Sequence, residues 1–433
     1  MFLARLLVLF SLVCISCAHS SFEQKQLKHA LDFATSNRLE LEILLQHYTY
    51  DSLKLEAAKF LIRNMPHCYS YQQGGEMDSV KRVRTYYSPF GQIDQTYARR
   101  WGHYTYRNLL KIYDAHIITA EYLIDNIDRA FDNWQKRPWN RSLSFEDFCE
   151  YLLPYRIGDE PLEEWRELYE KKYGYLLDSI YKGGDVVEAA NLVSRHLQEP
   201  VFIYCEDFEL PHIGPRYLFS HRYGSCVDAA DIVTYAFRAV GIPCMEDTDA
   251  RGGHVWNVVR DTTGRDVPIW YIASEAVRGS RDTGGYKRGK VYRPMYGFQE
   301  EKAAHLGDDW KSMPLLFYHP YMKDVSYAYY PDTLRILTGI PDDEVCYLAH
   351  FHEAHWWSCA CARSASGKME IPNLESELVY LPMKYTKGNY YPSGFPFWFA
   401  GGEINTFLPD WEKTVKVRLY RKYPVYGWLR SFM

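Results

Sequence analysis

What the chain lacks excludes several classes of protein. After residue 17 it has no Cys-x-x-Cys pair, which is the spacing typical of a zinc site, and its cysteines show no dense disulfide framework. A net charge of −5 gives no broad basic surface for nucleic acid. No segment after the N-terminus is apolar enough to span a membrane, and no internal repeat is present. We therefore expect no metal, no cofactor and no nucleic-acid partner.

What is present is typical of a globular protein with two or three domains. The 433 residues are 47% hydrophobic and 24% charged, which is enough for a substantial core. Tyrosine is abundant, with 38 residues. Its ring and hydroxyl suit sugar or peptide grooves, but most of these tyrosines are expected to fill half-exposed sheet faces and helix seams.

The N-terminus predicts export. Met1 to Arg5 supplies a short positive region, an apolar run from Leu6 to Ile15 follows, and Ser16-Cys17-Ala18 comes next. Residues 1–17 are therefore predicted to be a signal peptide, with lipidation at Cys17 and anchoring to a membrane. The residue three before Cys17 is Cys14, where an aliphatic residue is usual. The predicted location is the outer membrane or the cell surface; cleavage by an ordinary signal peptidase would instead give a periplasmic protein.

Periodicity divides the rest of the chain into three parts and predicts an α+β fold. Residues 18–175 show helical spacing, clearest in the amphipathic stretch from Ile117 to Trp134. Residues 176–321 are the predicted core. In residues 322–433, short apolar runs such as Val345 to Phe351 alternate with turns, which predicts an antiparallel β-sandwich.

The residues around Cys226 have the pattern of a helix start. Ser225 is a favourable N-cap, and Asp228 three residues later makes a variant of the capping box. Apolar residues recur at helical spacing from Ala229 to Val240, and Gly241-Ile242-Pro243 supplies a stop. Cys226 is therefore expected on the first turn, where the helix dipole favours a thiolate and the first amides can face an oxyanion.

A strand is predicted to begin at His254, because the run that follows is rich in valine. A turn over 261–265 would lead into a second strand from Val267 to Ser274. The end of that strand would bring Glu275 close to the imidazole, where the carboxylate could orient the ring. Asp266, nearer the turn, is a second candidate for this role.

These motifs resemble the transglutaminase-like superfamily, which has a papain-like core. Gly224-Ser225-Cys226-Val227-Asp228 is similar to the start of that family's nucleophile helix, and Gly253-His254-Val255-Trp256 to its histidine strand. The family usually has an aspartate a few residues after a tryptophan. Here Trp270 is followed by Ser274 and Glu275, so the resemblance implies the third catalytic role for Glu275.

The resemblance extends into the predicted helical part. Leu55 to Pro66, Phe145 to Cys149 and Leu153 to Arg156 are similar to segments of secreted transglutaminase-like proteins from Bacteroides-type bacteria. Arg156 could reach a substrate carboxylate, although a structural ion pair is the stronger expectation.

Each motif also has a purely structural interpretation. A cysteine beside alanines in a helix is often a small buried apolar residue, and a histidine in a strand is often a core residue. His350 and His352 would share a strand face and could begin a metal site, but no further ligands accompany them, so two ordinary sheet histidines are the stronger expectation.

The sequence thus predicts an exported thiol enzyme that acts on an amide or peptide. Cys226 would attack the carbonyl, His254 would move the proton and Glu275 would hold the imidazole. Hydrolysis and acyl transfer both remain open. The alternative is a non-catalytic surface module that binds a peptide, protein or glycan through aromatic residues and keeps the core as a relic. The aromatic residues considered for this were Trp356, Trp357, Trp398, Tyr390 and Tyr391.

Overall fold

The structure is a computed structural model. It describes residues 21–75, 77–79, 81, 106–204, 210–251, 253–272, 274–281, 287–300, 313–337, 342–352 and 355–413. The predicted signal peptide with Cys17 lies outside the described residues. So does the end of the predicted β-sandwich segment, after residue 413.

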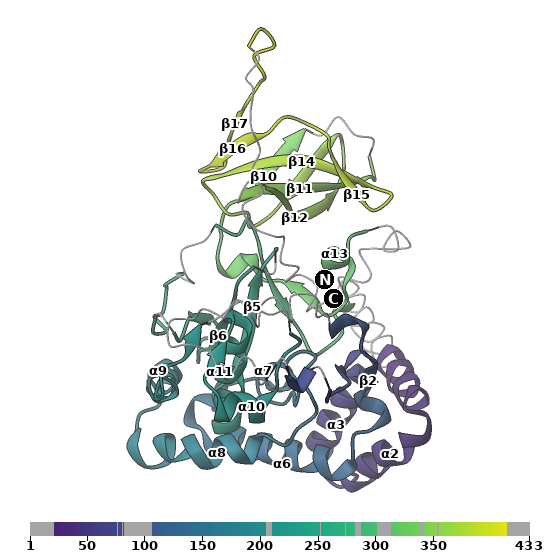
Figure 1. Ribbon diagram of the computed structural model, residues 1–433, viewed down its shortest axis with the longest axis vertical. Coiled ribbons are helices and arrows are strands. Elements are labelled where there is room, and N and C mark those ends of the chain that lie inside the picture. The colour runs from purple at the N-terminus through teal and green to yellow at the C-terminus, as the bar shows by residue number, and fades with distance from the viewer. Residues whose placement is uncertain are drawn as a thin grey trace, which may run out of the picture.

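Helices and antiparallel sheets both contribute, so the predicted α+β class is confirmed. Helices dominate the first half of the chain, at the bottom of Figure 1. After a helix over 21–33 come α2 (Arg38–His47), α3 (Ser52–Asn64), α6 (Ala120–Lys136), α7 (Phe145–Tyr151), α8 (Arg166–Tyr175) and α9 (Val186–Leu197). A short ladder pairs β1 (Tyr69–Tyr71) with β2 (Lys111–Tyr113). None of the helices in the described part of the chain has the length and apolar character needed to cross a membrane.

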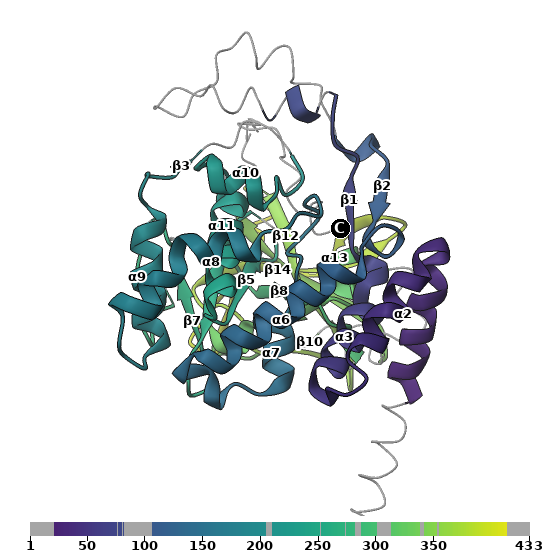
Figure 2. The same ribbon diagram turned by 90° about the horizontal axis from the view of Figure 1, so that it is seen from below.

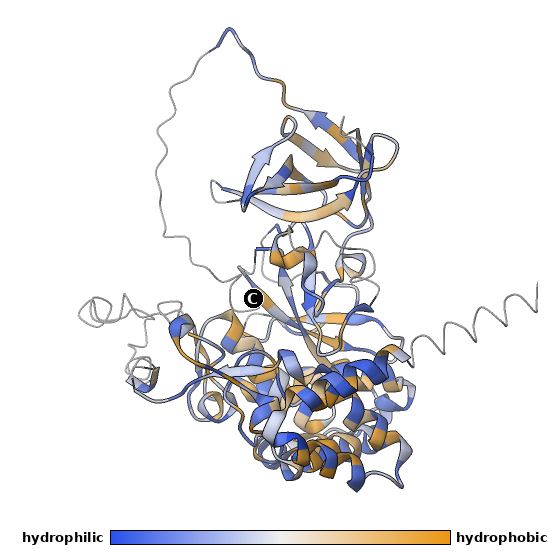
Figure 3. Ribbon diagram, turned by 90° about the vertical axis from the view of Figure 1, so that its right-hand side faces the viewer, coloured by the Kyte–Doolittle hydropathy of each residue, from blue (hydrophilic) through white to orange (hydrophobic). Residues whose placement is uncertain are grey.

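Short polar side chains cap the starts of α3, α6, α7 and α9. The Asp51 carboxylate accepts the N–H of Lys54 at the start of α3, and the Thr119 hydroxyl accepts the N–H of Tyr122 at the start of α6. Hydrophobic and hydrophilic residues are mixed along the helices in Figure 3. The apolar sides of α2, α3, α6 and α7 meet in one core, and those of α8 and α9 join the core around α11. Helix α6 packs against α2 and α3, and it also contacts α11 (Cys226–Val240) of the core (Figure 2).

The core is a five-stranded antiparallel sheet with α11 packed on one face. The strand order is β7-β6-β5-β8-β9. The strands are β5 (Cys244–Asp249), β6 (Val255–Arg260), β7 (Asp266–Ile269), β8 (Val291–Pro294) and β9 (Met322–Asp324). Before α11 come β3 (Ile203–Tyr204), α10 (Pro215–Ser220) and β4 (Tyr223–Gly224), with β3 and β4 parallel.

Two details differ from the sequence-based expectation. The predicted boundary between residues 321 and 322 falls at the edge of β9, which pairs with β8 inside the core sheet. The second strand of the hairpin ends at Ile269 rather than Ser274, because the chain turns back on itself and the Ser274 N–H donates to the Trp270 carbonyl at 2.7 Å.

The last part of the chain forms antiparallel sheets at the top of Figure 1. The larger sheet has the order β12-β11-β14-β16-β17, with β15 beside β14, and β10 pairs with β13. The strands are β10 (Leu334–Leu337), β11 (Val345–His352), β12 (His355–Arg363), β13 (Lys368–Ile371), β14 (Leu378–Thr386), β15 (Asn389–Pro392), β16 (Phe397–Ala400) and β17 (Glu403–Thr406). A short helix, α13 (Leu315–Tyr318), precedes them.

Candidate functional site

Helix α11 starts at Cys226, as predicted, and its start is a capping box. The Asp228 carboxylate accepts the backbone N–H of Ser225 at 2.7 Å and its hydroxyl at 3.1 Å. Gly224 makes this possible: it has φ +154°, and a Cβ there would lie 2.2 Å from the Asp228 carboxylate. The glycine before the cysteine is therefore required by the close approach of the capping side chain.

Cys226 occupies the first helical position of a helix that is buried along its whole length. Its own side chain is 3% exposed. The first amides of a helix have no intrahelical acceptor, and they create a positive potential at this end. The local setting is therefore the one in which a thiolate is stabilised.

The start of β6 lies at the same end of the core as the start of α11. In the middle of both elements, the Asn257 side chain donates to the Ala230 carbonyl at 3.0 Å and to the Thr234 hydroxyl at 2.9 Å. At the far end, the Arg260 N–H donates to the Pro243 carbonyl just after α11, at 3.1 Å. Helix and strand therefore run in the same direction, and their first residues share one end.

His254 immediately precedes β6 and is 6% exposed. Its ring makes an edge contact with Trp270, with centroids 4.4 Å apart, and lies 5.6 Å from the ring of Trp256. The Thr248 hydroxyl donates to the His254 carbonyl at 3.1 Å and holds the backbone. Because Asn257 points toward α11, strand alternation assigns His254 and Trp256 to the opposite face of the sheet. Two indole rings therefore contact the imidazole.

The structure does not bring Glu275 to the imidazole. Beyond the turn at Trp270, the Glu275 carboxylate pairs with Arg195 at 2.5 Å, and both side chains are more than half exposed. Asp266 is at the other end of β6, opposite Arg260, where it pairs with Arg293 at 2.7 Å. Six residues of strand, about 20 Å, separate that position from His254.

Sequence reasoning used Trp270 only as a marker of the resemblance, although its ring makes the edge contact with His254. Nothing in the spacing could show this, because the contact depends on the turn that ends β7. An indole beside an imidazole fixes the ring plane but accepts no hydrogen bond in the way that a carboxylate does.

The remaining predicted site residues have structural surroundings. Arg156 is buried in a bidentate pair with Asp114, which confirms the structural interpretation. His350 is fully buried on β11, and burial lowers its pKa to about 4. Within the described ranges, no group of three or more His, Cys, Asp or Glu side chains could hold a metal ion.

Comparisons with known proteins assign the chain to no family. A scan against protein-family models and searches of curated proteins and of solved structures found no match to the chain. The functional argument therefore depends on this chain's own residues.

Proposed function

We propose that this protein is an exported thiol enzyme that transfers acyl groups, most simply by hydrolysing an amide or peptide bond. Cys226 is the nucleophile and His254 the base. The observation that carries the proposal is the shared end of α11 and β6, which places both buried residues at one edge of the core. The imidazole is on the tryptophan face, so the proposal requires it to reach Cys226 around the end of the sheet.

The chemistry needs only these two side chains and water. His254 accepts the thiol proton, and Cys226 Sγ bonds to the carbonyl carbon while the first amides of α11 face the oxyanion. Collapse breaks the C–N bond, and the imidazolium protonates the leaving amine. Water, deprotonated by His254, then cleaves the thioester and restores the thiol. An amine in place of water gives transfer instead of hydrolysis.

The finer fold assignment belongs to the same proposal. A buried helix that begins at a cysteine and packs on an antiparallel sheet supports a papain-like, transglutaminase-like core. We further propose that the strands after residue 330 form a β-sandwich, and that lipidation at Cys17 anchors the protein to the outer membrane or cell surface.

Alkylation with iodoacetamide tests the thiol. The Cys226 peptide is followed by mass spectrometry at about pH 6 and pH 8, and we expect Cys226 to react at about pH 6 at least about tenfold faster than in His254→Ala. Cys149 is the matched control, because it is equally buried and burial raises the pKa of its thiol. Equal rates in wild type and His254→Ala would remove the histidine from the mechanism.

Turnover tests the enzyme directly. Cleavage of a fluorogenic peptide library is expected to vanish in Cys226→Ala and to persist in Cys149→Ala. Full cleavage by Cys226→Ala would exclude this mechanism.

A second candidate is a surface module that binds a peptide or glycan. It is favoured by aromatic rings exposed on the C-terminal sheet: Phe351 is 47% exposed, Trp356 36% and Tyr391 54%. Phe351 and Trp356 lie side by side, with centroids 5.0 Å apart, and offer a stacking face. The other aromatics considered are partly buried: Trp357, Trp398 and Tyr390. A glycan or peptide array bound by Cys226→Ala but not by Trp356→Ala, with an unshifted Cys226 thiol, would favour this candidate.

A further inference from the structure

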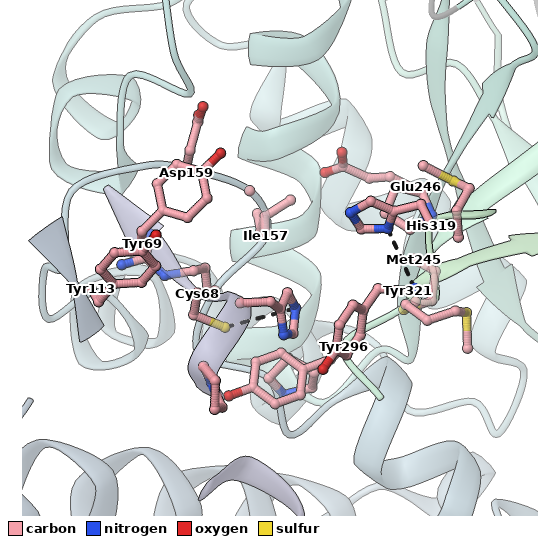
Figure 4. A pocket seen from close by; sticks show the side chains of 18 of the residues that line it. Cys68, Tyr69, Tyr113, Ile157, Asp159, Met245, Glu246, Tyr296, His319 and Tyr321 are labelled. Carbon is pink, nitrogen blue, oxygen red and sulfur yellow. Dashed lines mark hydrogen bonds between the residues drawn. The ribbon is translucent and has the colours of Figure 1, made fainter. Parts of the chain in front are cut away.

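A cavity of about 340 Å³ lies between the β1-β2 ladder and strand β5, with residues 154–159 and 315–322 in its wall. Its volume is within the range of small-molecule sites, roughly 300–1,000 Å³. In Figure 4, Tyr69 and Asp159 are on one side of the cavity, with Glu246 on the other. Segments distant in the sequence therefore enclose a space large enough for a small ligand.

The β1-β2 ladder contributes one aromatic face with a single cation. Tyr69 pairs with Tyr113 and Tyr71 with Lys111, so the four side chains share a face of the ladder. Three of them, Tyr69, Lys111 and Tyr113, line the cavity. The Lys111 ammonium lies 3.9 Å from the ring centroid of Tyr69 and 6.0 Å from that of Tyr71. Among the described residues, these ring contacts are the only interactions of that ammonium.

The loop over 154–159 adds a carboxylate to the same side of the cavity. Asp159 is 5% exposed, and its Oδ1 accepts the backbone N–H of His212 at 2.9 Å. Its Oδ2 has no hydrogen-bond partner in the described part of the chain, and unlike Glu246 Oε2 it is not fully enclosed by the protein. Asp159 Oδ2 is therefore an acceptor that a ligand can reach.

The other arginine and acidic side chains of the wall are already engaged within the protein. Arg156 pairs with Asp114, and Arg238 donates to backbone carbonyls. Glu246 accepts the Thr234 hydroxyl with one oxygen, and its other oxygen is enclosed. The ammonium and the carboxylate described above are therefore the two charges that a ligand could meet.

These two charges lie close together without neutralising each other. Both are beside Tyr69: the Lys111 ammonium is over its ring, and burial followed by the Asp159 carboxylate raises its pKa. Neither group forms an ion pair with any residue that the structure describes. A zwitterion whose ammonium and carboxylate are one carbon atom apart would satisfy both charges at once.

The rest of the wall suits a large apolar group. His67 stacks on Tyr321 with ring centroids 3.6 Å apart, and Tyr296 and Met245 lie beside them in the wall. Burial lowers the pKa of His67 to about 3, so this imidazole adds no charge at neutral pH. Aromatic rings and a thioether pack well on an aromatic or long aliphatic side chain.

We propose that the cavity binds a free α-amino acid with an aromatic or large aliphatic side chain. The ligand ammonium donates to Asp159 Oδ2, the ligand carboxylate accepts from the Lys111 ammonium, and the ligand side chain packs on the tyrosines. The site goes beyond the proposed thiol chemistry, because neither Cys226 nor His254 lines the cavity.

Calorimetric titration of the purified full chain at neutral pH tests the need for both charges. The ligands are phenylalanine, N-acetylphenylalanine, which has no ammonium, and phenylalaninamide, which has no carboxylate. We expect each blocked analogue to bind at least about tenfold more weakly than phenylalanine, because each loses one charge-assisted hydrogen bond. Absence of phenylalanine binding, or an analogue that binds as tightly as phenylalanine, would overturn the proposal.

A variant of Lys111 tests its contact with the ligand carboxylate. Lys111→Met keeps the aliphatic stem and removes the ammonium, so phenylalanine should bind at least about tenfold more weakly and no better than phenylalaninamide. The preference over N-acetylphenylalanine should remain. The matched control is Lys172→Met, because the Lys172 ammonium lies 4.6 Å from the Phe219 ring centroid, outside the cavity. A preference for phenylalanine over its amide that survives in Lys111→Met would overturn the proposal.

A variant of Asp159 tests the other contact. Asp159→Asn keeps an acceptor for the His212 N–H and removes the charge, so the preference for phenylalanine over N-acetylphenylalanine should disappear. If that preference is retained, the carboxylate does not hold the ligand and the proposal is wrong. Where Asp159→Asn does not fold, the exposed position Lys111 decides through the preceding variant.

One further variant separates this site from the proposed enzyme. Cys226→Ala should bind phenylalanine as wild type does, whatever its effect on peptide cleavage. Loss of phenylalanine binding in Cys226→Ala would contradict a site independent of the thiol.

Discussion

Glu246 and Asp247 are adjacent on β5 and belong to opposite faces of the core sheet. On the face away from α11, Asp247 accepts two hydrogen bonds from Arg293, at 2.5 and 2.9 Å, and one from the Tyr329 hydroxyl at 2.7 Å. On the α11 face, Glu246 accepts one hydrogen bond, from Thr234. Both residues are at most 5% exposed.

The difference separates a carboxylate that is paired with a guanidinium from a carboxyl group that forms no ion pair among the described residues. A buried charge that meets a bidentate guanidinium is neutralised and contributes to packing on its own face. A buried carboxyl group without an ion pair favours its protonated form, and burial raises the pKa of Glu246 to about 8. The same strand thus supplies an ion pair to one face and a carboxyl group of raised pKa to the other.

The largest effect is expected on the face of the sheet where Arg293 pairs with buried carboxylates. Arg293→Met leaves Asp247 buried without a guanidinium and Asp266 with Arg260 alone, and it should lower the free energy of unfolding by about 3–5 kcal/mol. Urea denaturation measures this loss. The matched control is Arg335→Met, whose pair with Glu370 is exposed and should contribute less than about 1 kcal/mol. Similar losses in both variants would contradict the comparison.

The second largest effect is expected at Glu246, on the opposite face of the sheet. The pKa of Glu246 rises from 4.5 in the unfolded chain to about 8, so the folded state holds a proton that the unfolded state has released. The stability that this group contributes is present below about pH 4.5 and is lost as pH rises through about 8. Glu246→Gln removes the titration. Its stability relative to wild type should therefore grow by about 2–4 kcal/mol across that window.

Urea denaturation of wild type and Glu246→Gln at several pH values measures how the difference in their stability changes with pH. Groups that titrate equally in the two proteins cancel in the difference. A relative stability that stays flat or shrinks with rising pH would show that Glu246 is ionised in the folded protein.

A smaller effect is expected at the start of α11. Gly224→Ala sets a Cβ against the Asp228 carboxylate and strains a backbone with φ +154°. The substitution should lower the free energy of unfolding by about 2 kcal/mol and slow iodoacetamide labelling of Cys226, because the capping box is displaced. Gly264→Ala is the control: Gly264 has φ +77° but nothing within 4 Å of its Cβ position, so it reports backbone strain alone. If both variants lose the same free energy of unfolding, the close approach of the Asp228 carboxylate to residue 224 does not contribute to the loss.

The smallest effect is expected at Glu275. Because its pair with Arg195 is exposed, Glu275→Gln should change the free energy of unfolding by less than about 1 kcal/mol. Peptide cleavage and Cys226 labelling should match wild type within about twofold. A large loss of cleavage with unchanged stability would return Glu275 to the catalytic machinery.

The elements that the sequence predicted well are those with local signals. Helix α11 begins at Cys226 and ends before Gly241, whose φ of +83° is left-handed, because both caps involve near neighbours in the chain. Turns at Lys387-Gly388-Asn389 and Ala400-Gly401-Gly402 join paired strands, in a part of the chain where short strands alternating with turns were predicted. The strand predicted to begin at His254 begins one residue later, at Val255.

The features that the sequence did not reveal depend on contacts between residues distant in the chain. The turn after Trp270 shortens β7 and carries Glu275 to Arg195, which is 80 residues away in the chain. Strand β9 joins the core sheet by pairing with β8, across a boundary that composition alone had suggested. Neither event has a signal within a short window of sequence.

By itself the sequence determined where α11 starts, which residue stands on its first turn and which residue precedes β6, since hydrogen bonds within a few residues decide such features. Tertiary structure alone decided that the indole of Trp270 contacts His254 and that Asp247 pairs with the Arg293 guanidinium. It also decided that Glu246 is buried without an ion pair among the described residues. Burial and charge compensation depend on which distant segments meet, and that is a property of the folded chain.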